Sequence, residues 1–227
     1  MEGLSVSVCL ASYNGIKYIG NQIDSILPQL KESDELLISD DGSTDGTLEY
    51  VQWLSQKDKR VKVISGPQEG VNANFFSLIA RADKDIILIA DQDDIWYDTK
   101  IDRIRSAFEN NPDVKVVLHE DTIFYEDEDR EVQCTRLRHG VVRNILKNSY
   151  SGHRMAIKKE FKTKIKVRSN NCPAYDMYLG LLAEKERCSL FLNERLDKHI
   201  MHGNNITKHL NLWEKISIRV KLLKCIL

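Results

Sequence analysis

Three carboxylates within four residues are the most chemically suggestive feature of this chain. Asp91, Asp93 and Asp94 follow directly on the apolar run 86–90. A run without polar alternation predicts a central strand covered on both faces. Open α/β sheets bind ligands at the carboxyl ends of their strands. Acids this close repel one another unless a cation or solvent neutralises them. We therefore expect Mg²⁺ or Mn²⁺, hard ions that share oxygen ligands with substrate phosphates, in a metal–diphosphate site.

A second polar turn follows the predicted strand at 35–39 and begins with Asp40 and Asp41. It precedes the acidic run in the same series of α/β repeats, so both strand ends would face the same crevice. Asp41 would accept hydrogen bonds from a nucleobase or ribose while Asp93 holds the metal. A calcium loop is disfavoured, because the twelfth position counted from Asp41 is Gln52 where a bidentate Glu is needed.

The sequence shows neither of the familiar glycine-rich phosphate loops. A Walker-type loop with Lys-Ser/Thr is missing, and so is a GxGxxG turn. A diphosphate cannot be cradled by those devices, and a metal bridge is the natural substitute.

Strand and helix patterns alternate in the first half of the chain. Strands are expected at 4–10, 35–39, 61–64 and 85–90, with helical apolar spacing between them. This repetition predicts an α/β fold with a doubly wound, mixed but mostly parallel sheet. Ser43 or Thr44 is expected to cap the second helix. The later pattern is looser, with helices expected at 99–110 and 175–185, strands at 114–118 and 190–192, and no assignment for 136–147.

Repeats, low-complexity tracts and Pro/Gly-rich linkers are missing, so we expect one domain over residues 1–207. Residues 208–227 would form a basic amphipathic helix. Its apolar side chains share one face, and positive charge surrounds them at Lys215, Arg219, Lys221 and Lys224. Two interpretations stay open: the helix packs on the domain, or it rests on an anionic membrane surface.

Composition limits the possible partners. Charged residues make up 30% of the chain and the net charge is −1, so nothing predicts a nucleic-acid partner. The run from Arg136 to Arg168 has eleven Lys or Arg and one acid, and faces solvent, an anionic substrate or a membrane.

Five scattered cysteines favour a reducing cytoplasm. Since no signal peptide or spanning apolar run is recognised, we expect a cytoplasmic protein, in contact at most with the inner face of the cell membrane.

Several motifs occur in a characteristic order. They are Val8-Cys9-Leu10-Ala11-Ser12-Tyr13-Asn14-Gly15, Asp40-Asp41-Gly42-Ser43, Ala90-Asp91-Gln92-Asp93-Asp94-Ile95-Trp96, Ser151-Gly152 and His202-Gly203-Asn204-Asn205. Over roughly residues 4–207 this set resembles glycosyltransferase family 2, the inverting nucleotide-sugar transferases with a GT-A fold. The third motif, which stands in for the family's DxD element, is close to that of bacterial rhamnosyltransferase-like members.

The resemblance implies a role for each matched residue. Asp176 falls at the position of the catalytic base, and Asp93 with Asp91 would hold the metal. Trp96 and Gly152 would lie on the acceptor side, although Trp96 could equally be an aromatic wall of the core, and Asp94 could cap the next helix. The donor-binding residues would be Ser12, Tyr13, Asn14, Asp40, Asp41, Asn74, Asp91, Gln92 and His202.

The implied reaction moves one sugar from a nucleotide-sugar donor, dTDP-rhamnose or a UDP-hexose, to a glycan or lipid-linked oligosaccharide in cell-surface polysaccharide synthesis. One departure is Ile200, where many relatives carry an Arg that binds donor phosphates; Lys198 or His199 is a candidate replacement. The Gln-x-x-Arg-Trp motif of processive polysaccharide synthases is missing, which favours the addition of a single sugar.

Two other functions remain as alternatives. A sugar-nucleotide pyrophosphorylase would carry an early glycine-rich loop with Arg and Lys, which residues 10–20 lack. A non-catalytic sugar- or nucleotide-binding protein on the same fold would not need Asp176.

Overall fold

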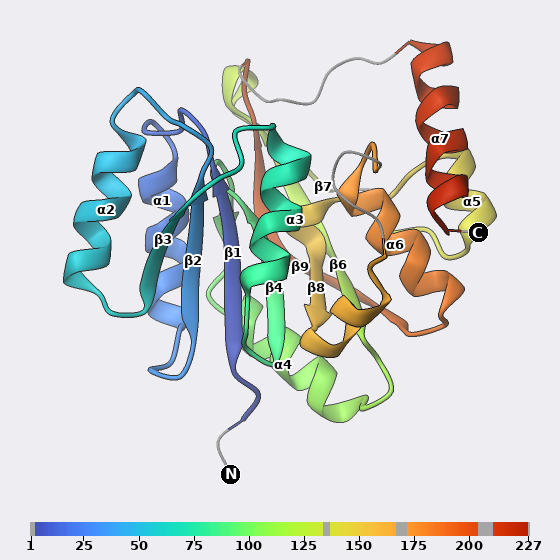
Figure 1. The fold of residues 1–227 in the computed structure, drawn as a ribbon, viewed down its shortest axis with the longest axis horizontal. Coiled ribbons are helices and arrows are strands. Elements are labelled where there is room, and N and C mark those ends of the chain that lie inside the picture. The colour runs from blue at the N-terminus through green and yellow to red at the C-terminus, as the bar shows by residue number, and fades with distance from the viewer. Residues whose placement is uncertain (1–2, 134–136, 167–171, 204–210, 227) are drawn as a thin grey trace.

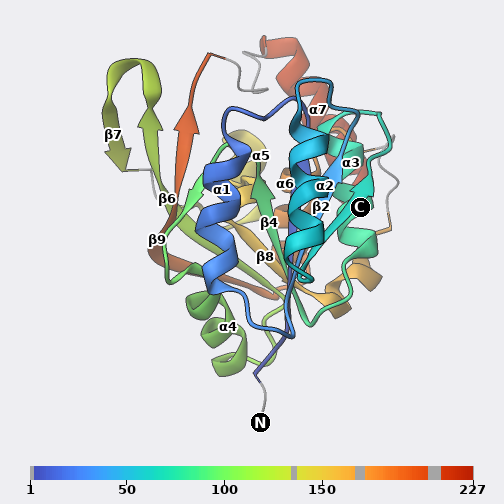
Figure 2. The same ribbon diagram turned by 90° about the vertical axis from the view of Figure 1, so that its left-hand side faces the viewer.

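The computed structural model describes residues 3–133, 137–166, 172–203 and 211–226. These residues form one nine-stranded sheet with helices on both faces (Figures 1 and 2). The strand order is β3-β2-β1-β4-β8-β6-β9-β5, and β7 pairs with β6. The strands are β1 (Val6–Ser12), β2 (Glu35–Asp40), β3 (Val61–Ser65), β4 (Ile86–Asp91), β5 (Ile95–Trp96), β6 (Val116–Tyr125), β7 (Arg130–Gln133), β8 (Met155–Lys158) and β9 (Ser189–Met201).

The sheet confirms the predicted mixed α/β fold. Strands β3, β2, β1 and β4 are all parallel, as the strand–helix repetition predicts, and β9 lies parallel to β6. Strand β8 runs antiparallel between β4 and β6 and joins the two parallel parts. Successive side chains of β1 point to opposite faces, so Val8 and Leu10 enter one apolar cluster and Cys9 enters the other.

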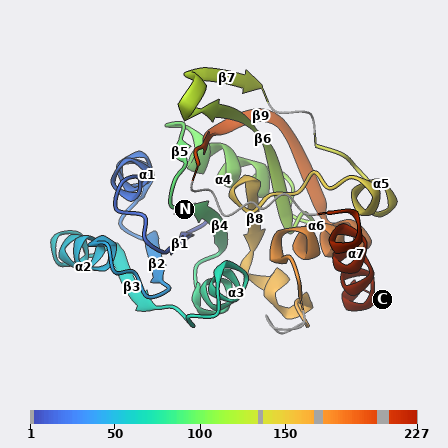
Figure 3. The ribbon, with the colours of Figure 1, turned by 90° about the horizontal axis from the view of Figure 1, so that it is seen from above.

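Two apolar layers hold the helices against the sheet (Figure 3). Helices α1 (Ile19–Ile26), α2 (Thr47–Lys57) and α4 (Lys100–Asn110) cover one face. Helices α3 (Val71–Arg81) and α6 (Tyr175–Lys185) cover the other, together with α7 (Leu212–Ile226). Short α5 (Val141–Leu146) lies beside α6 and α7, within the stretch that the sequence left unassigned.

Some local expectations were wrong. Neither Ser43 nor Thr44 caps α2, whose N-cap is Gly46 with a φ of 97°. The Ser43 hydroxyl instead donates to Asp40, because the β2–α2 turn folds back onto that carboxylate. Strand β9 is 13 residues long where only a short strand was expected, because it continues beside β6 through two shifts of register.

The amphipathic C-terminal helix is present as α7, and it packs on α6. Leu222 is fully buried there, and Ile226 is 7% exposed. In the part of the chain that the structure describes, no helix is both long and apolar enough to cross a bilayer.

Candidate active site

The carboxyl ends of three neighbouring strands bring the predicted motifs together. Ser12 at the end of β1 is in register with Asp40 at the end of β2. On the other side of β1, Ala11 is in register with Asp91 at the end of β4. Motifs that are about 30 and 80 residues apart therefore meet at one edge of the sheet, as the parallel pairing predicts.

Gln92 connects the turn after β4 to the turn after β1. Its side-chain amide accepts a hydrogen bond from Tyr13 N at 2.9 Å and donates one to Tyr13 O at 3.0 Å. Gly15 lies so close that a Cβ there would be 2.1 Å from Gln92 Oε1. The Tyr13 side chain is 52% exposed, so it does not serve as a packing residue and is available to a ligand.

Asp40 organises the turn after β2 from inside. Its carboxylate accepts hydrogen bonds from Gly42 N, from Ser43 N and Oγ, and from Ser12 Oγ, at 2.6–3.1 Å. Asn14 joins the same turn, since its N–H donates to Ser43 Oγ and its Oδ1 accepts from Thr44 N. Ser12 and Asp40 are buried, so their side chains act on the shape of the turn.

Asp41 and Asn74 fix the neighbouring loop and helix. The Asp41 carboxylate accepts from Gln68 N at 2.7 Å and from Gly70 N at 3.0 Å, which ties down the loop before α3. Asn74, on α3, donates to Ser39 O at 3.0 Å. Its buried Oδ1 has no hydrogen-bond partner among the described residues, and such an acceptor usually has one.

Asp93 and His202 pair with each other, and protein largely covers both side chains. His202 Nε2 lies 3.0 Å from Asp93 Oδ2, and the imidazole stacks on Tyr18 with ring centroids 4.2 Å apart. Burial, followed by the negative charges of Asp91 and Asp94, raises the pKa of Asp93 to about 6. Carboxylates are the ligands that Mg²⁺ and Mn²⁺ prefer, and an ion bound to Asp93 would relieve the repulsion that raises this pKa.

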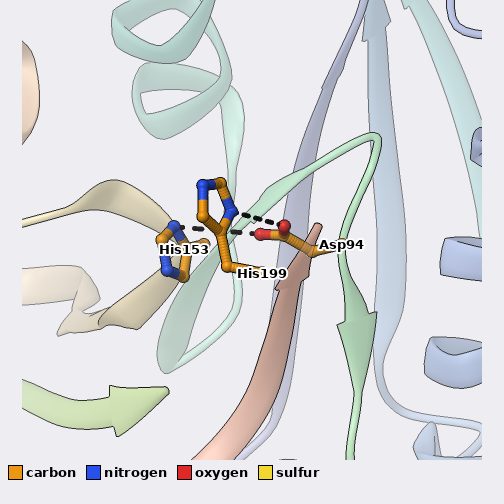
Figure 4. A group of neighbouring side chains, drawn as sticks. All are labelled: Asp94, His153 and His199. Carbon is orange, nitrogen blue, oxygen red and sulfur yellow. Dashed lines mark hydrogen bonds and ion pairs between the residues drawn. The ribbon is translucent and has the colours of Figure 1, made fainter. Parts of the chain in front are cut away.

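Asp94 faces two histidines, His153 and His199 (Figure 4). Its Oδ1 is 2.7 Å from His199 Nδ1 and also accepts a hydrogen bond from Ile200 N at 3.3 Å. Its Oδ2 is 3.8 Å from His153 Nδ1, and the two imidazoles stack with centroids 4.6 Å apart. Asp94 does not cap α4, whose N-cap is Thr99, because β9 holds this side chain.

His153 belongs to a buried network behind the site. Its Nε2 is 3.0 Å from Asp121 Oδ2, and its Nδ1 is 3.6 Å from Asp91 Oδ2. Burial alone would lower the pKa of His153, but Asp94 and the other nearby carboxylates hold it well above the ordinary value. Below it, Lys100 Nζ donates to Asp197 Oδ2 at 2.6 Å and to His153 O at 2.8 Å. The imidazolium thus supports Asp91 and Asp94 from inside the protein.

Asp176 lies in the first turn of α6, close enough to Asp91 for the charges of the two carboxylates to interact. Its Oδ1 accepts a hydrogen bond from Met177 N at 2.7 Å. Burial, with a smaller contribution from the charge of Asp91, raises the pKa of Asp176 to about 6. A carboxylate with that pKa is ionised at neutral pH and is still basic enough to accept a proton.

Asn72 and Gly152 determine where Asp176 sits. Asn72 Oδ1 accepts from Tyr175 N at 2.7 Å, which fastens the start of α6 to α3. A Cβ at Gly152 would be 1.8 Å from Tyr175 Oη, so the Tyr175 ring fits only because residue 152 is glycine. Gly152, predicted as an acceptor-side residue, therefore makes room for the residue next to Asp176.

The chain matches the model of Glycosyl transferase family 2 over residues 7–177. It belongs to that family. Over 98 residues it is 36% identical to the dTDP-rhamnosyl transferase RfbG of Shigella flexneri, a segment that covers 40% of this chain and 34% of the relative. The chain spans less than half the length of the curated relatives compared with it.

Solved structures confirm the GT-A type of fold for this family 2 glycosyltransferase. S. aureus TarS 1–349 in complex with UDP-GlcNAc superimposes with a TM-score of 0.75 at 17% identity, over 97% of this chain and 67% of that one. The mannosyltransferase PcManGT of Pyrobaculum calidifontis, in complex with GDP-Man and Mn²⁺, superimposes with a TM-score of 0.65 at 15% identity, over 90% and 59%.

The structure corrects the expectation for Trp96. The side chain is 2% exposed and belongs to the apolar cluster under α1 and α4, with Lys100 Nζ 4.1 Å from the ring centroid. Its ring is covered by protein and does not stack on a sugar, so the alternative, an aromatic wall of the core, is the better description.

The sequence pattern of this family 2 protein did not indicate several residues around the site, and two residues of the last motif lie outside the described part of the chain. Asn72, His153, Asp121 and Asp197 carried no local sequence signal, although His153 directly follows the quoted Ser151-Gly152 motif. Lys198 pairs with Glu131 and His199 with Asp94, so both candidate replacements for the phosphate-binding Arg are engaged by carboxylates. Asn204 and Asn205 lie outside the described residues.

Proposed function

We propose that this chain transfers a single sugar from a nucleotide-sugar donor to an acceptor hydroxyl, with inversion at the anomeric carbon. The observation that supports this best is the placement of Asp176. It is a carboxylate with a raised pKa, and it lies near enough to Asp91 for the charge of Asp91 to contribute to that rise.

The nucleoside half of the donor would lie over the ends of β1 and β2. Tyr13 is exposed there, and Asp40, Asp41 and Asn14 hold the surrounding turns in shape. The buried Oδ1 of Asn74 has no hydrogen-bond partner among the described residues. It would accept a hydrogen bond from the nucleotide sugar or from a water. Gln92 would keep the Tyr13 turn aligned with the metal-binding strand end.

Asp93, Asp91 and His202 would hold a divalent ion, Mg²⁺ or Mn²⁺. When bound, the ion neutralises the negative charge of the departing nucleoside diphosphate. Asp94 would support these ligands from behind, because its Oδ1 is engaged by His199 and Ile200 N and its Oδ2 lies 3.8 Å from His153 Nδ1. The charged His153 would keep Asp91 oriented from behind.

Asp176 would accept the proton of the acceptor hydroxyl as its oxygen attacks the anomeric carbon. The bond from that carbon to the diphosphate oxygen breaks in the same step, and the proton stays on Asp176 until solvent removes it. A single displacement inverts the configuration at that carbon.

Two similar proteins suggest candidates for the donor. RfbG is by its name a dTDP-rhamnosyl transferase, and the TarS structure holds UDP-GlcNAc. We infer dTDP-rhamnose or a UDP-hexose as donor and a glycan or lipid-linked oligosaccharide of the cell surface as acceptor. This reaction would take place in the cytoplasm, where nucleotide sugars are made.

A donor panel tests the proposal. The purified chain is incubated with dTDP-rhamnose, UDP-hexoses and GDP-mannose, with Mn²⁺ or Mg²⁺ and carrier-lipid acceptors, and nucleoside-diphosphate release is measured. One donor is expected to turn over, and a chelator is expected to stop the release. Turnover of none of them would refute the proposal, and pyrophosphate-dependent formation of a sugar phosphate would favour a pyrophosphorylase instead.

A further inference from the structure

Helix α7 has two apolar faces. One packs on the protein through Leu222 and Ile226. On the other side Trp213, Ile216 and Val220 are 78%, 41% and 47% exposed. With 3.6 residues per turn these three side chains form a single stripe. A helix that only packs on a domain needs one apolar face, and its solvent side is normally polar.

Helix α5, which lies beside α7, carries two further exposed apolar side chains. Val142 and Leu146, one turn apart, are 72% and 73% exposed. The Arg219 guanidinium of α7 donates to Leu146 O at 3.2 Å, and also to Ile145 O, at the end of α5. The two helices therefore lie side by side (Figures 1 and 3).

The α5–α7 patch is defined as Val142, Leu146, Trp213, Ile216 and Val220. It contains half of the ten large apolar side chains that are exposed among the described residues. Concentration of exposed apolar residues on one face is typical of an interaction surface, whereas scattered single residues are not.

Positive charge surrounds the patch. Residues 138–147 and 211–226 contain seven Lys or Arg and one acid, Glu214, although the whole chain has a net charge of −1. Lys215, Lys221 and Lys224 are exposed on α7 itself. Apolar side chains including a Trp, with basic residues around them, are the composition of helices that lie in the interface of an anionic bilayer.

We propose that the α5–α7 patch docks this protein on an anionic lipid surface. Trp213 and its apolar neighbours enter the interfacial region, and the surrounding lysines and arginines contact lipid phosphates. The surface is built from residues outside the candidate active site, so the inference does not depend on the proposed reaction.

Vesicle sedimentation of the full chain tests this docking. We expect the protein to sediment with vesicles of phosphatidylcholine and phosphatidylglycerol, but not with phosphatidylcholine alone, and binding should fall as salt rises. Lys221→Gln and Lys224→Gln should each weaken binding about fivefold. The matched changes Lys57→Gln and Lys59→Gln, at exposed lysines near the end of α2, should leave it unchanged.

Apolar contact is tested separately. The double variant Trp213→Ser, Val220→Ser should lose vesicle binding, whereas Trp53→Ser, at an exposed Trp of α2, should keep it. In a Trp53→Phe background Trp213 is the only exposed Trp, and its fluorescence should shift to shorter wavelength when anionic vesicles are added.

Three results would overturn the proposal. The first is no sedimentation with anionic vesicles, and the second is equal binding to neutral vesicles without salt dependence. The third is the absence of vesicle binding together with a dimer in gel filtration that the Trp213→Ser, Val220→Ser change dissociates. The patch would then join two copies of the chain. Donor turnover without vesicles is measured in parallel and reports on the active site alone.

Discussion

Gln92 and Tyr13 hold each other through two hydrogen bonds that join the end of β4 to the end of β1. The Gln92 amide accepts from Tyr13 N at 2.9 Å and donates to Tyr13 O at 3.0 Å. The middle residue of the DxD-type motif is thus a connector: it aligns the turn proposed to bind the nucleoside with the carboxylates proposed to hold the metal.

Replacing Gln92 with Met should weaken donor binding more than it lowers stability. Met keeps the length of the side chain but makes neither hydrogen bond, and each is worth about 1 kcal/mol. We expect a donor Kd roughly tenfold higher by calorimetry. Gly15→Ala should have the same effect, because a Cβ there would displace the Gln92 amide. Gln56→Met, on the exposed side of α2, is the control, and unchanged donor binding in both Gln92→Met and Gly15→Ala would contradict the connector role.

Turnover should fall on the acid side of about pH 6, because Asp176 must be ionised to accept a proton. Its pKa is raised to about 6, so the ionised, active carboxylate predominates above that pH and is lost as the pH drops below it. Asp93 also has a pKa of about 6, but protons and metal compete for it. Raising the metal concentration should therefore shift any contribution of Asp93 to lower pH and leave the Asp176 limb in place. A kcat profile that is flat from pH 7 to pH 5 at saturating metal would contradict the assignment.

His202→Ala should weaken metal binding without unfolding the protein. The imidazole is 3.0 Å from Asp93 Oδ2, and it would be the one nitrogen ligand of the proposed ion. Loss of such a ligand is expected to raise the Mn²⁺ concentration at half-maximal activity roughly 10–100-fold, as for other changes around metal sites. His139→Ala, at a histidine whose ring is tilted against that of Phe191 outside the site, should leave it unchanged. Equal metal requirements in both variants would exclude His202 as a ligand.

The sequence predicted the strand ends well and the residues behind them poorly. Asp40, Asp91 and Asp93 follow apolar runs in a repeating α/β pattern, and parallel pairing then places them together. His153, Asp121 and Lys100 come from separate elements that only the tertiary structure joins, and a single buried histidine or lysine has no periodicity to reveal it. The burial of Trp96 was open in the sequence because an aromatic residue after a strand end suits both a core and a sugar platform.

Lys100→Met should destabilise the fold strongly although the residue lies outside the proposed donor site. Its ammonium group pairs with Asp197 at 2.6 Å, and both side chains are buried. Removing one partner leaves an uncompensated buried charge, at a cost of about 3–5 kcal/mol in the free energy of unfolding. The double change Lys100→Met, Asp197→Leu should recover most of this loss in urea denaturation, and Lys59→Met should be neutral. A single variant as stable as the wild type would show that the pair contributes little.

We propose that Asp93 serves donor and metal binding, whereas Asp176 serves only the chemical step. The most direct test measures metal-dependent nucleoside-diphosphate release and donor affinity in wild type, Asp93→Ala and Asp176→Asn. We predict that Asp93→Ala loses both donor affinity and its response to metal. Asp176→Asn should bind donor as the wild type does and lose most of its turnover. Wild-type turnover in Asp176→Asn, or undiminished activity of chelator-treated Asp93→Ala, would contradict the account.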